Sequence, residues 1–315
     1  MPDGPVRHLP FERIAFIGFG LIGGSMALAL RGWERYAGAA AGQHLHMTAW
    51  SPSQEGTRQA RTSGVLDGVA HDAVAATKDA QLVVLAGPPA AIVQALGAMA
   101  GPWAHTHPGA VVTDVGSTKA AIIEQARASE IRFVGGHPMA GRTARGFHGA
   151  SATLFAGRSW VLCPDGARPE DLDAVETTVR AMGAEPIRLS ATAHDAAVAA
   201  VSHVPLLSSV ALVEAVGAEL LADPIAARLA ASGWRSATRL AGGSAAMGAG
   251  IAATNRNAIL PRLRELRGAI DGWIAALESP DADLRERFER AREQLEAIRA
   301  LTGDRKGGGD EGEEA

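Results

Sequence analysis

The stretch that decides the fold is RIAFI at residues 13–17, followed by GFGLIG at residues 18–23. An apolar run of strand length precedes three glycines in the spacing G-x-G-x-x-G, and helix-forming residues 25–30 come next. Glycines permit a tight turn and a close approach of the backbone to a pyrophosphate, and the helix N-terminus offers free N–H donors. We predict a dinucleotide site here rather than a purely structural turn. The expected contacts are Gly18, Gly20, Leu21, Ile22 and Gly23.

Short apolar runs alternate with amphipathic or alanine-rich segments from Arg13 to about Leu189. The runs lie at residues 14–17, 45–50, 82–85, 110–113, 132–134 and 159–162. This alternation is typical of a parallel α/β sheet with helices on both faces. We therefore predict an α/β fold in which residues 1–189 form an N-terminal Rossmann-type, doubly wound domain that binds NAD(P). Small residues at 37–43 are expected to form a loop.

The strand signal disappears after Ala191. Helices are predicted at residues 192–221, 224–231, 245–277 and 281–301. Long helices with mixed faces often bury themselves against a second copy, so residues 190–302 are expected to form an all-helical domain for dimerisation and substrate binding. The Gly- and acid-rich residues 303–315 are predicted to be a disordered tail.

Composition excludes several classes of protein. The 315 residues are 47% hydrophobic and 20% charged, and the net charge of −4 provides no basic surface for nucleic acid. Cys163 is the single cysteine, so an intramolecular disulfide and a cysteine-rich metal site are excluded and a cytoplasmic location is expected. Two apolar stretches, 81–104 and 196–213, contain Pro or polar residues and are expected to be buried elements, so no membrane partner is predicted.

The residues around the second strand bear on which dinucleotide binds. This strand ends in Ser51 rather than in the carboxylate that usually binds the ribose hydroxyls, and Arg58 and Arg61 follow. We therefore favour NADP over NAD, although both arginines could equally lie on a solvated helix face. Gly87 and Pro88, after the run 82–85, are expected to contact the cofactor too.

His137 is the leading candidate for the chemistry. It stands in GGHPMAG at residues 135–141, just after an apolar strand, where the ligand crevice of a parallel sheet opens. A histidine with an ordinary pKa near 6.5 can accept a proton from a substrate hydroxyl. Ser117, at another strand end, could orient that hydroxyl or could cap the next helix.

The helical half offers cations rather than a metal site. Arg235 and Arg239 are four residues apart and could hold a substrate carboxylate from one helix face, or could simply be solvated. His194 and His203 are nine apart, nearly opposite on a helix, and the H-E-x-x-H motif is absent. No metal is predicted.

Five motifs occur together in a defined order. They are GFGLIGGS (18–25), DVGSTK (114–119), GGHPMAG (135–141), SHVPLL (202–207) and SGWRSATRLAGG (232–243). In this order and approximate spacing the chain resembles the prephenate/arogenate dehydrogenase family of tyrosine biosynthesis, from about Arg13 to Leu301. The resemblance implies oxidative decarboxylation of a cyclohexadienyl substrate with NAD or NADP by a homodimer. It implies that His137 accepts the ring hydroxyl proton and that Ser117 supports this hydroxyl. It places Ser202, His203, Arg239 and, more weakly, Arg235 at the substrate.

One departure from the family pattern concerns the substrate. Many members that use prephenate carry a second histidine in S-H-x-P-H, where this chain has Leu206. Both substrates therefore stay open, with arogenate favoured. A β-hydroxyacid dehydrogenase is the alternative enzyme, but it needs a lysine that this chain lacks between Lys119 and Lys306. A non-catalytic NAD(P) sensor is the other alternative.

Overall fold

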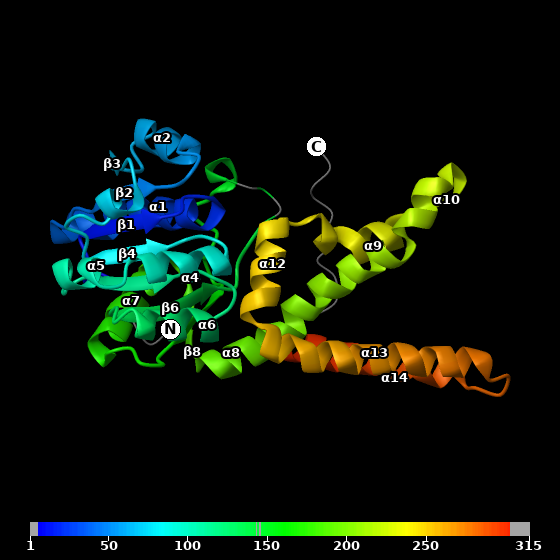
Figure 1. Cartoon of the computed structure of the whole chain (residues 1–315). Coiled ribbons are helices and arrows are strands. Elements are labelled where there is room, and N and C mark those ends of the chain that lie inside the picture. Colours follow the sequence, from blue (N-terminus) through cyan, green and yellow to red (C-terminus); the bar gives the residue numbers. More distant parts are fainter. Residues whose placement is uncertain (1–5, 143, 145, 303–315) are drawn as a thin grey trace. The chain divides into compact units, whose positions relative to one another are not determined.

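The computed structural model describes residues 6–142, 144 and 146–302, which form two compact units divided between Arg262 and Leu263. The predicted disordered tail, 303–315, lies outside the described residues. The first unit is built on an eight-stranded sheet in the order β3-β2-β1-β4-β5-β6-β7-β8 (Figure 1). The strands are β1 (Arg13–Ile17), β2 (His46–Trp50), β3 (Gly68–Val69), β4 (Leu82–Leu85), β5 (Val111–Asp114), β6 (Phe133–Pro138), β7 (Ser159–Cys163) and β8 (Glu185–Arg188).

The predicted doubly wound α/β fold is confirmed, with three differences in its sheet. The two strands that the sequence did not predict are short or polar: β3 has two residues, and β8 reads Glu-Pro-Ile-Arg at the sheet edge. The expectation of an all-parallel sheet is wrong at one pair, because β7 runs antiparallel to β6. Strand β6 also continues to Pro138, so His137 lies inside this strand and pairs with Val161 rather than following the strand.

Side chains alternate between two cores on the two faces of the sheet. Ile14 and Phe16 of β1 point into one core, and Ala15 points into the other. Helices α1 (Leu21–Trp33) and α7 (Pro169–Ala181) cover the first face. Helices α4 (Pro89–Ala98), α5 (Pro102–Thr106) and α6 (Ala120–Ala128) cover the second. Because both faces are covered, β4 and β5 are buried along their whole length, and the central strands read as largely apolar runs.

The strand order reverses between β1 and β4, which lie side by side at the centre of the sheet. The carboxyl ends of such neighbouring strands bound the crevice in which open α/β sheets take their ligands. Outside this centre, α2 (Glu55–Thr62) and α3 (Ala73–Ala76) flank β3. The expected loop at 37–43 is instead largely helical, with a π-helical turn at Glu34–Gly38 and a 3-10 turn at Ala39–Ala41.

The helices predicted after Ala191 are present, with breaks that the sequence pattern did not reveal. Helix α8 (Ala191–Val198) leads through a π-helical turn (Ala199–His203) into α9 (Val204–Ala222). Helices α10 (Pro224–Arg228), α11 (Ser232–Thr238) and α12 (Ala245–Thr254) follow, and α12 packs on α4. Asn255 separates α12 from α13 (Arg256–Glu278).

The second compact unit holds the C-terminal part of α13 and α14 (Leu284–Thr302). Within it, the Trp273 and Phe288 rings lie 5.0 Å apart, and the Arg287 guanidinium lies 4.3 Å from the centre of the Trp273 ring. This cation–π contact joins the two helices.

One helical stretch in the described residues, Ala191–Ala222, is long and apolar enough by length and composition to cross a membrane. The expectation that its apolar residues are buried is wrong for the single chain, because only 22% of its most apolar 18-residue window is buried. The core helix of a soluble protein can pass the same test of length and composition, and so can a face covered by another subunit.

Candidate active site

The glycine loop after β1 has the conformation that a dinucleotide requires. Gly18 has a φ of +89°, and a Cβ atom there would lie 2.4 Å from the Ala86 carbonyl oxygen, so only glycine fits. A Cβ at Gly23 would lie 2.9 Å from the Gly18 oxygen, whereas Gly20 faces open space. No side chain caps α1 at its N-terminus, and its first turn contains no acidic residue. The N–H groups of this turn therefore fit a pyrophosphate.

The other predicted cofactor residues surround the same end of the sheet. Gly87 and Pro88 follow β4, and Ala86 donates its N–H to the carbonyl of Ile17 in β1 at 2.7 Å, so the two strand ends lie together. Ser51 follows β2 and is buried. Arg58 and Arg61 are exposed on α2 and share a cavity of about 580 Å³ with Gln54 and His71.

A buried ion pair ties together the carboxyl ends of β5 and β6. The Lys119 ammonium bonds the Asp114 carboxylate, and both side chains are fully buried. Lys119 Nζ also donates to the Gly136 carbonyl at 2.8 Å, while the Gly136 N–H donates to Asp114 Oδ1 at 3.0 Å. Gly136 is the neighbour of His137, so these bonds fix the backbone that carries the candidate base.

His137 lies against a second histidine. Its Nδ1 is 2.8 Å from Nε2 of His194 in α8, and the two rings meet at 78°. His194 Nδ1 in turn lies 2.8 Å from Oδ1 of Asp195. Burial holds the pKa of His137 well below its usual value, and the positive charge of Lys119 acts in the same direction, as protonation of His194 or His203 would. His137 is therefore neutral at pH 7 and able to accept a proton.

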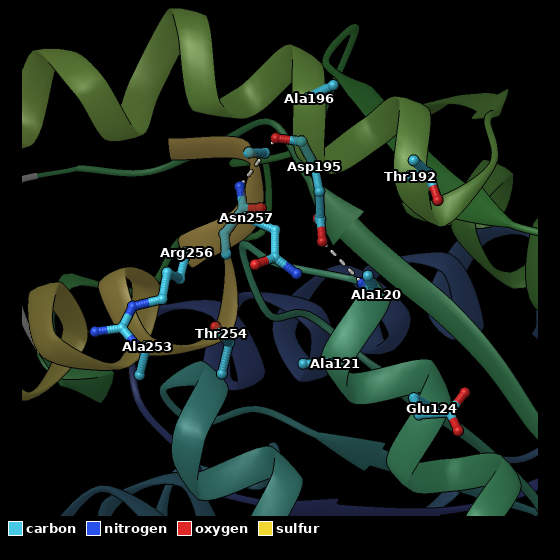
Figure 2. Close-up of a pocket in the computed structure, with 12 residues that line it drawn as sticks. Ala120, Ala121, Glu124, Thr192, Asp195, Ala196, Ala253, Thr254, Arg256 and Asn257 are labelled. Carbon is cyan, nitrogen blue, oxygen red and sulfur yellow. Dashed lines mark hydrogen bonds between the residues drawn. The ribbon is translucent and has the colours of Figure 1, made fainter. Parts of the chain in front are cut away.

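Asp195 links this histidine pair to the start of α6. Its Oδ1 accepts the Lys119 N–H at 2.8 Å and its Oδ2 accepts the Ala120 N–H at 2.9 Å. Figure 2 shows the Asp195 side chain reaching from α8 to Ala120. The N-cap role considered for Ser117 is wrong, because Lys119 occupies the N-cap position and Asp195 supplies the capping oxygens. Ser117 Oγ, a buried atom with no hydrogen-bond partner among the described residues, remains available to a ligand.

Like Ser117 Oγ, Nε2 of His203 is a buried polar atom without a hydrogen-bond partner among the described residues. Asn255 donates one amide N–H to the Asp195 carbonyl at 2.9 Å and the other to His203 Nδ1 at 3.0 Å. An amide nitrogen only donates, so the proton of neutral His203 is on Nε2, which has no hydrogen-bond partner in the described part of the chain. Burial lowers the pKa of His203 to about 4, although Asp195 opposes this shift. His203 is thus a neutral donor.

The remaining predicted substrate residues lie on exposed parts of the helical region. Ser202 is exposed in the π-helical turn before α9. Arg235 is exposed on α11, which ends at Thr238, so Arg239 begins a 3-10 turn and the two arginines do not share one regular helix. Among the described residues, neither arginine forms a hydrogen bond or an ion pair with His137, and their substrate roles stay predictions.

A cavity of about 760 Å³ lies on another side of Asp195, between the starts of α6, α8 and α13 (Figure 2). Its lining contains none of the sequence-predicted site residues. Within the residues described, no group of three or more His, Cys, Asp or Glu side chains is placed to hold a metal ion.

Sequence reasoning missed four residues of this cluster: Lys119 as an ion-pair partner, and His194, Asp195 and Asn255. His194 was considered only as a metal ligand, since nothing in its spacing indicates a partner 57 residues earlier. The only available signal was a His-Asp pair on an otherwise apolar helix, where buried charged groups need partners.

The glycine loop and the N-terminus of α1 lie where the strand order reverses between β1 and β4. A neutral histidine, His137, lies near the carboxyl end of β6 in the same sheet. Together these features define an NAD(P)-dependent dehydrogenase. Comparison with known proteins is more specific. The model of the prephenate dehydrogenase nucleotide-binding domain matches residues 39–188, and that of the prephenate dehydrogenase dimerization domain matches residues 190–293. The chain belongs to the prephenate dehydrogenase family. The glycine loop at 18–23 precedes the matched range, so its assignment depends on its own geometry.

The chain is also similar to individual dehydrogenases with related names. Prephenate dehydrogenase of Bacillus subtilis is 32% identical over 280 residues, which cover 86% of this chain and 72% of that protein. Cyclohexadienyl dehydrogenase of Zymomonas mobilis is 28% identical over 92% of this chain and 97% of its own length. The crystal structure of Synechocystis arogenate dehydrogenase superposes with a TM-score of 0.66 at 30% identity, covering 93% of this chain and 98% of that one.

Proposed function

We propose that this protein catalyses the oxidative decarboxylation of a cyclohexadienyl substrate, prephenate or arogenate, with NAD(P)⁺. The observation that carries the proposal is the neutral His137, bonded on one ring nitrogen and placed near the carboxyl end of β6, in the same sheet whose strand β1 leads into the dinucleotide loop. Ser117 Oγ and His203 Nε2 supply further buried polar atoms that have no protein partner in the described chain. Buried polar groups of this kind favour a ligand that can bond them.

The proposed chemistry balances with the cofactor as the only oxidant. Bound NAD(P)⁺ supplies the acceptor for the hydride of the ring carbon that bears the hydroxyl. His137 forms a new N–H bond as the hydroxyl O–H bond breaks, and the bond from the ring to its carboxylate breaks to release CO₂. The electron pair of that bond moves through the ring to the oxygen, which takes the proton back from His137. The ring becomes aromatic, which drives the carbon–carbon cleavage. Ser117 and His203 orient the substrate, and Arg239 binds a substrate carboxylate, with Ser202 and Arg235 nearby.

Arogenate and NADP are the favoured pair. Leu206, half-buried in α9, stands where a histidine would offer a polar contact to the prephenate side chain. At the cofactor, Ser51 leaves no carboxylate to repel a 2′-phosphate, and Arg58 and Arg61 line one cavity nearby. A Ser51→Asp substitution should shift the preference from NADP towards NAD, and an unchanged ratio of the two kcat/KM values would contradict this cofactor assignment.

The helical region, residues 190–302, is proposed to form a homodimer in the cytoplasm. Large apolar side chains remain exposed on its first helices: Val201, Leu221, Ile225 and Leu229 are 70–89% exposed. Covering such side chains with a second copy would remove an apolar surface that a monomer rarely leaves in water. The match of residues 190–293 to a dimerization domain supports this arrangement.

The direct test is a two-by-two assay of purified protein with prephenate or arogenate and NAD⁺ or NADP⁺. Growth of absorbance from reduced nicotinamide is expected, fastest with arogenate and NADP⁺. Absence of turnover in all four combinations, by protein shown to bind a reduced nicotinamide cofactor, would overturn the proposed function.

A further inference from the structure

We infer that His194 and Asp195 are positioning residues that fix the proton of neutral His137 on Nδ1 and thereby leave Nε2 as the base. The role of that base rests on the function proposed above. The hydrogen-bond chain itself is an observation about the protein alone.

The Asp195 carboxylate determines which nitrogens of His194 and His137 donate. A carboxylate only accepts hydrogen bonds, so His194 Nδ1 must donate to Asp195 Oδ1 across their 2.8 Å separation. We take the His194 ring to carry a single proton, which it donates to Asp195, so His194 Nε2 is an acceptor. His137 Nδ1, 2.8 Å away, must donate to it. The lone pair of His137 is consequently on Nε2.

His194 and the Asp195 carboxylate, at the end of this series of hydrogen bonds, are held firmly in place. His194 and Asp195 are 1% and 4% exposed, respectively. Asp195 accepts two backbone N–H groups at the start of α6, where the helix dipole favours a negative charge. Its own carbonyl accepts the Asn255 amide. Three elements, α6, α8 and the α12–α13 junction, therefore hold the carboxylate that sets the tautomer.

The arrangement also suits the charged state that catalysis creates. When the hydroxyl proton moves to Nε2, His137 becomes an imidazolium, and its Nδ1–H still donates to His194. No transfer to His194 is needed, because the proton stays on His137 until it returns to the ring oxygen of the aromatic product. An orienting partner of this kind stabilises the charged ring and prevents the unproductive tautomer.

The tautomer can be measured without substrate. In ¹⁵N-histidine-labelled full-length protein at pH 7, side-chain NMR is expected to show His137 protonated on Nδ1 and unprotonated on Nε2, with His137→Gln providing the assignment. A proton on His137 Nε2 would overturn the inference, because it would require His194 to donate from both nitrogens. This readout does not depend on turnover, so it separates a failure of the relay from a failure of the proposed function.

Kinetic measurements on His194 variants distinguish a residue that orients His137 from one that only fills space. His194→Gln keeps an amide oxygen to accept from His137 Nδ1, whereas His194→Leu fills the space with no acceptor. We expect His194→Leu to lower kcat by about 100-fold with KM changed by less than about threefold, and His194→Gln to recover at least about tenfold of that loss. The control His107→Leu removes a half-buried histidine stacked on Trp103, away from the site, and should leave kcat unchanged.

Two outcomes would contradict the inference. Equal activity of the Leu and Gln variants would indicate a packing role. If His194→Leu does not fold, His194→Gln alone decides. The inference would be contradicted if His194→Gln kept the wild-type kcat while its His137 tautomer differed from that of the wild type.

Discussion

At the scale of single residues, the surroundings of His137 determine when it can act. Burial lowers its pKa, and the positive charge of Lys119 adds to the effect. In the proposed mechanism the neutral ring is the active form, so a lowered pKa would keep this base active at a pH where an ordinary histidine would already be protonated.

The pH dependence of kcat/KM tests this point, because this quantity reports the pKa values of the free enzyme. We expect it to stay level as the pH falls from 8 to 6.5, and to decline only below the usual histidine value, where His137 gains its proton. An acid limb with its midpoint at or above pH 6.5 would show that His137 is not the titrating base, or that its pKa is not lowered.

The predictions that His137 is the base and that the glycines form the dinucleotide cradle could be made from local sequence, because each depends on neighbours within a few positions. The contacts of His194 and Asp195 could not be predicted from local sequence. Their partners, His137 and Ala120, are 57 and 75 residues away, and only the folded α8 brings them together.

At the scale of secondary-structure elements, α6 begins with a capping carboxylate from another helix. Asp195→Ala removes both oxygens that accept the Lys119 and Ala120 N–H groups and leaves buried donors unpaired. We expect the free energy of unfolding to fall by about 2–4 kcal/mol in chemical denaturation, together with kcat.

The matched control is Asp72→Ala, which removes an exposed aspartate that caps α3 through the Ala75 N–H. It should cost about 1 kcal/mol and leave kcat unchanged. If Asp195→Ala were no more destabilising than this control, the cap assigned to α6 would be wrong.

The glycine loop offers a second test at this scale. Gly18→Ala should lower the melting temperature, because its Cβ would collide with the Ala86 carbonyl and its φ is positive. Gly20→Ala has open space beside it, so we expect stability to be kept while NAD(P)H binding, followed by fluorescence, weakens by at least about tenfold.

A control for this pair is Gly32→Ala, also beside open space but at the far end of α1. It should alter neither binding nor, except by a small gain, stability. Unchanged cofactor affinity in Gly20→Ala would remove the loop from the binding site.

The sequence also predicted most elements correctly, since buried central strands read as uninterrupted apolar runs. It missed β8, whose Glu, Pro and Arg do not read as a strand and which pairs only at the sheet edge. It could not predict the antiparallel direction of β7, because direction depends on the path of the connecting chain rather than on the apolar run itself.

At the scale of the whole molecule, the exposed apolar side chains of α9 and α10 indicate a partner surface. Light scattering coupled to size-exclusion chromatography should give twice the chain mass of 32.4 kDa. Replacing Leu221 and Leu229 together by glutamate should shift the protein towards the monomer, because each charge would be buried without a partner.

The control is Tyr36→Glu, at a side chain that is 87% exposed and lies outside the helical region. It should remain dimeric. A monomeric wild-type protein with full activity would contradict the proposed dimer.

In the proposed function, His137 initiates an oxidation coupled to decarboxylation. With substrate labelled by ¹³C at the ring carboxylate, we expect one labelled CO₂ for each reduced nicotinamide, and loss of both signals by at least about 100-fold in His137→Asn, with NAD(P)H affinity kept. Reduced nicotinamide without labelled CO₂, or near-normal kcat in His137→Asn, would contradict it.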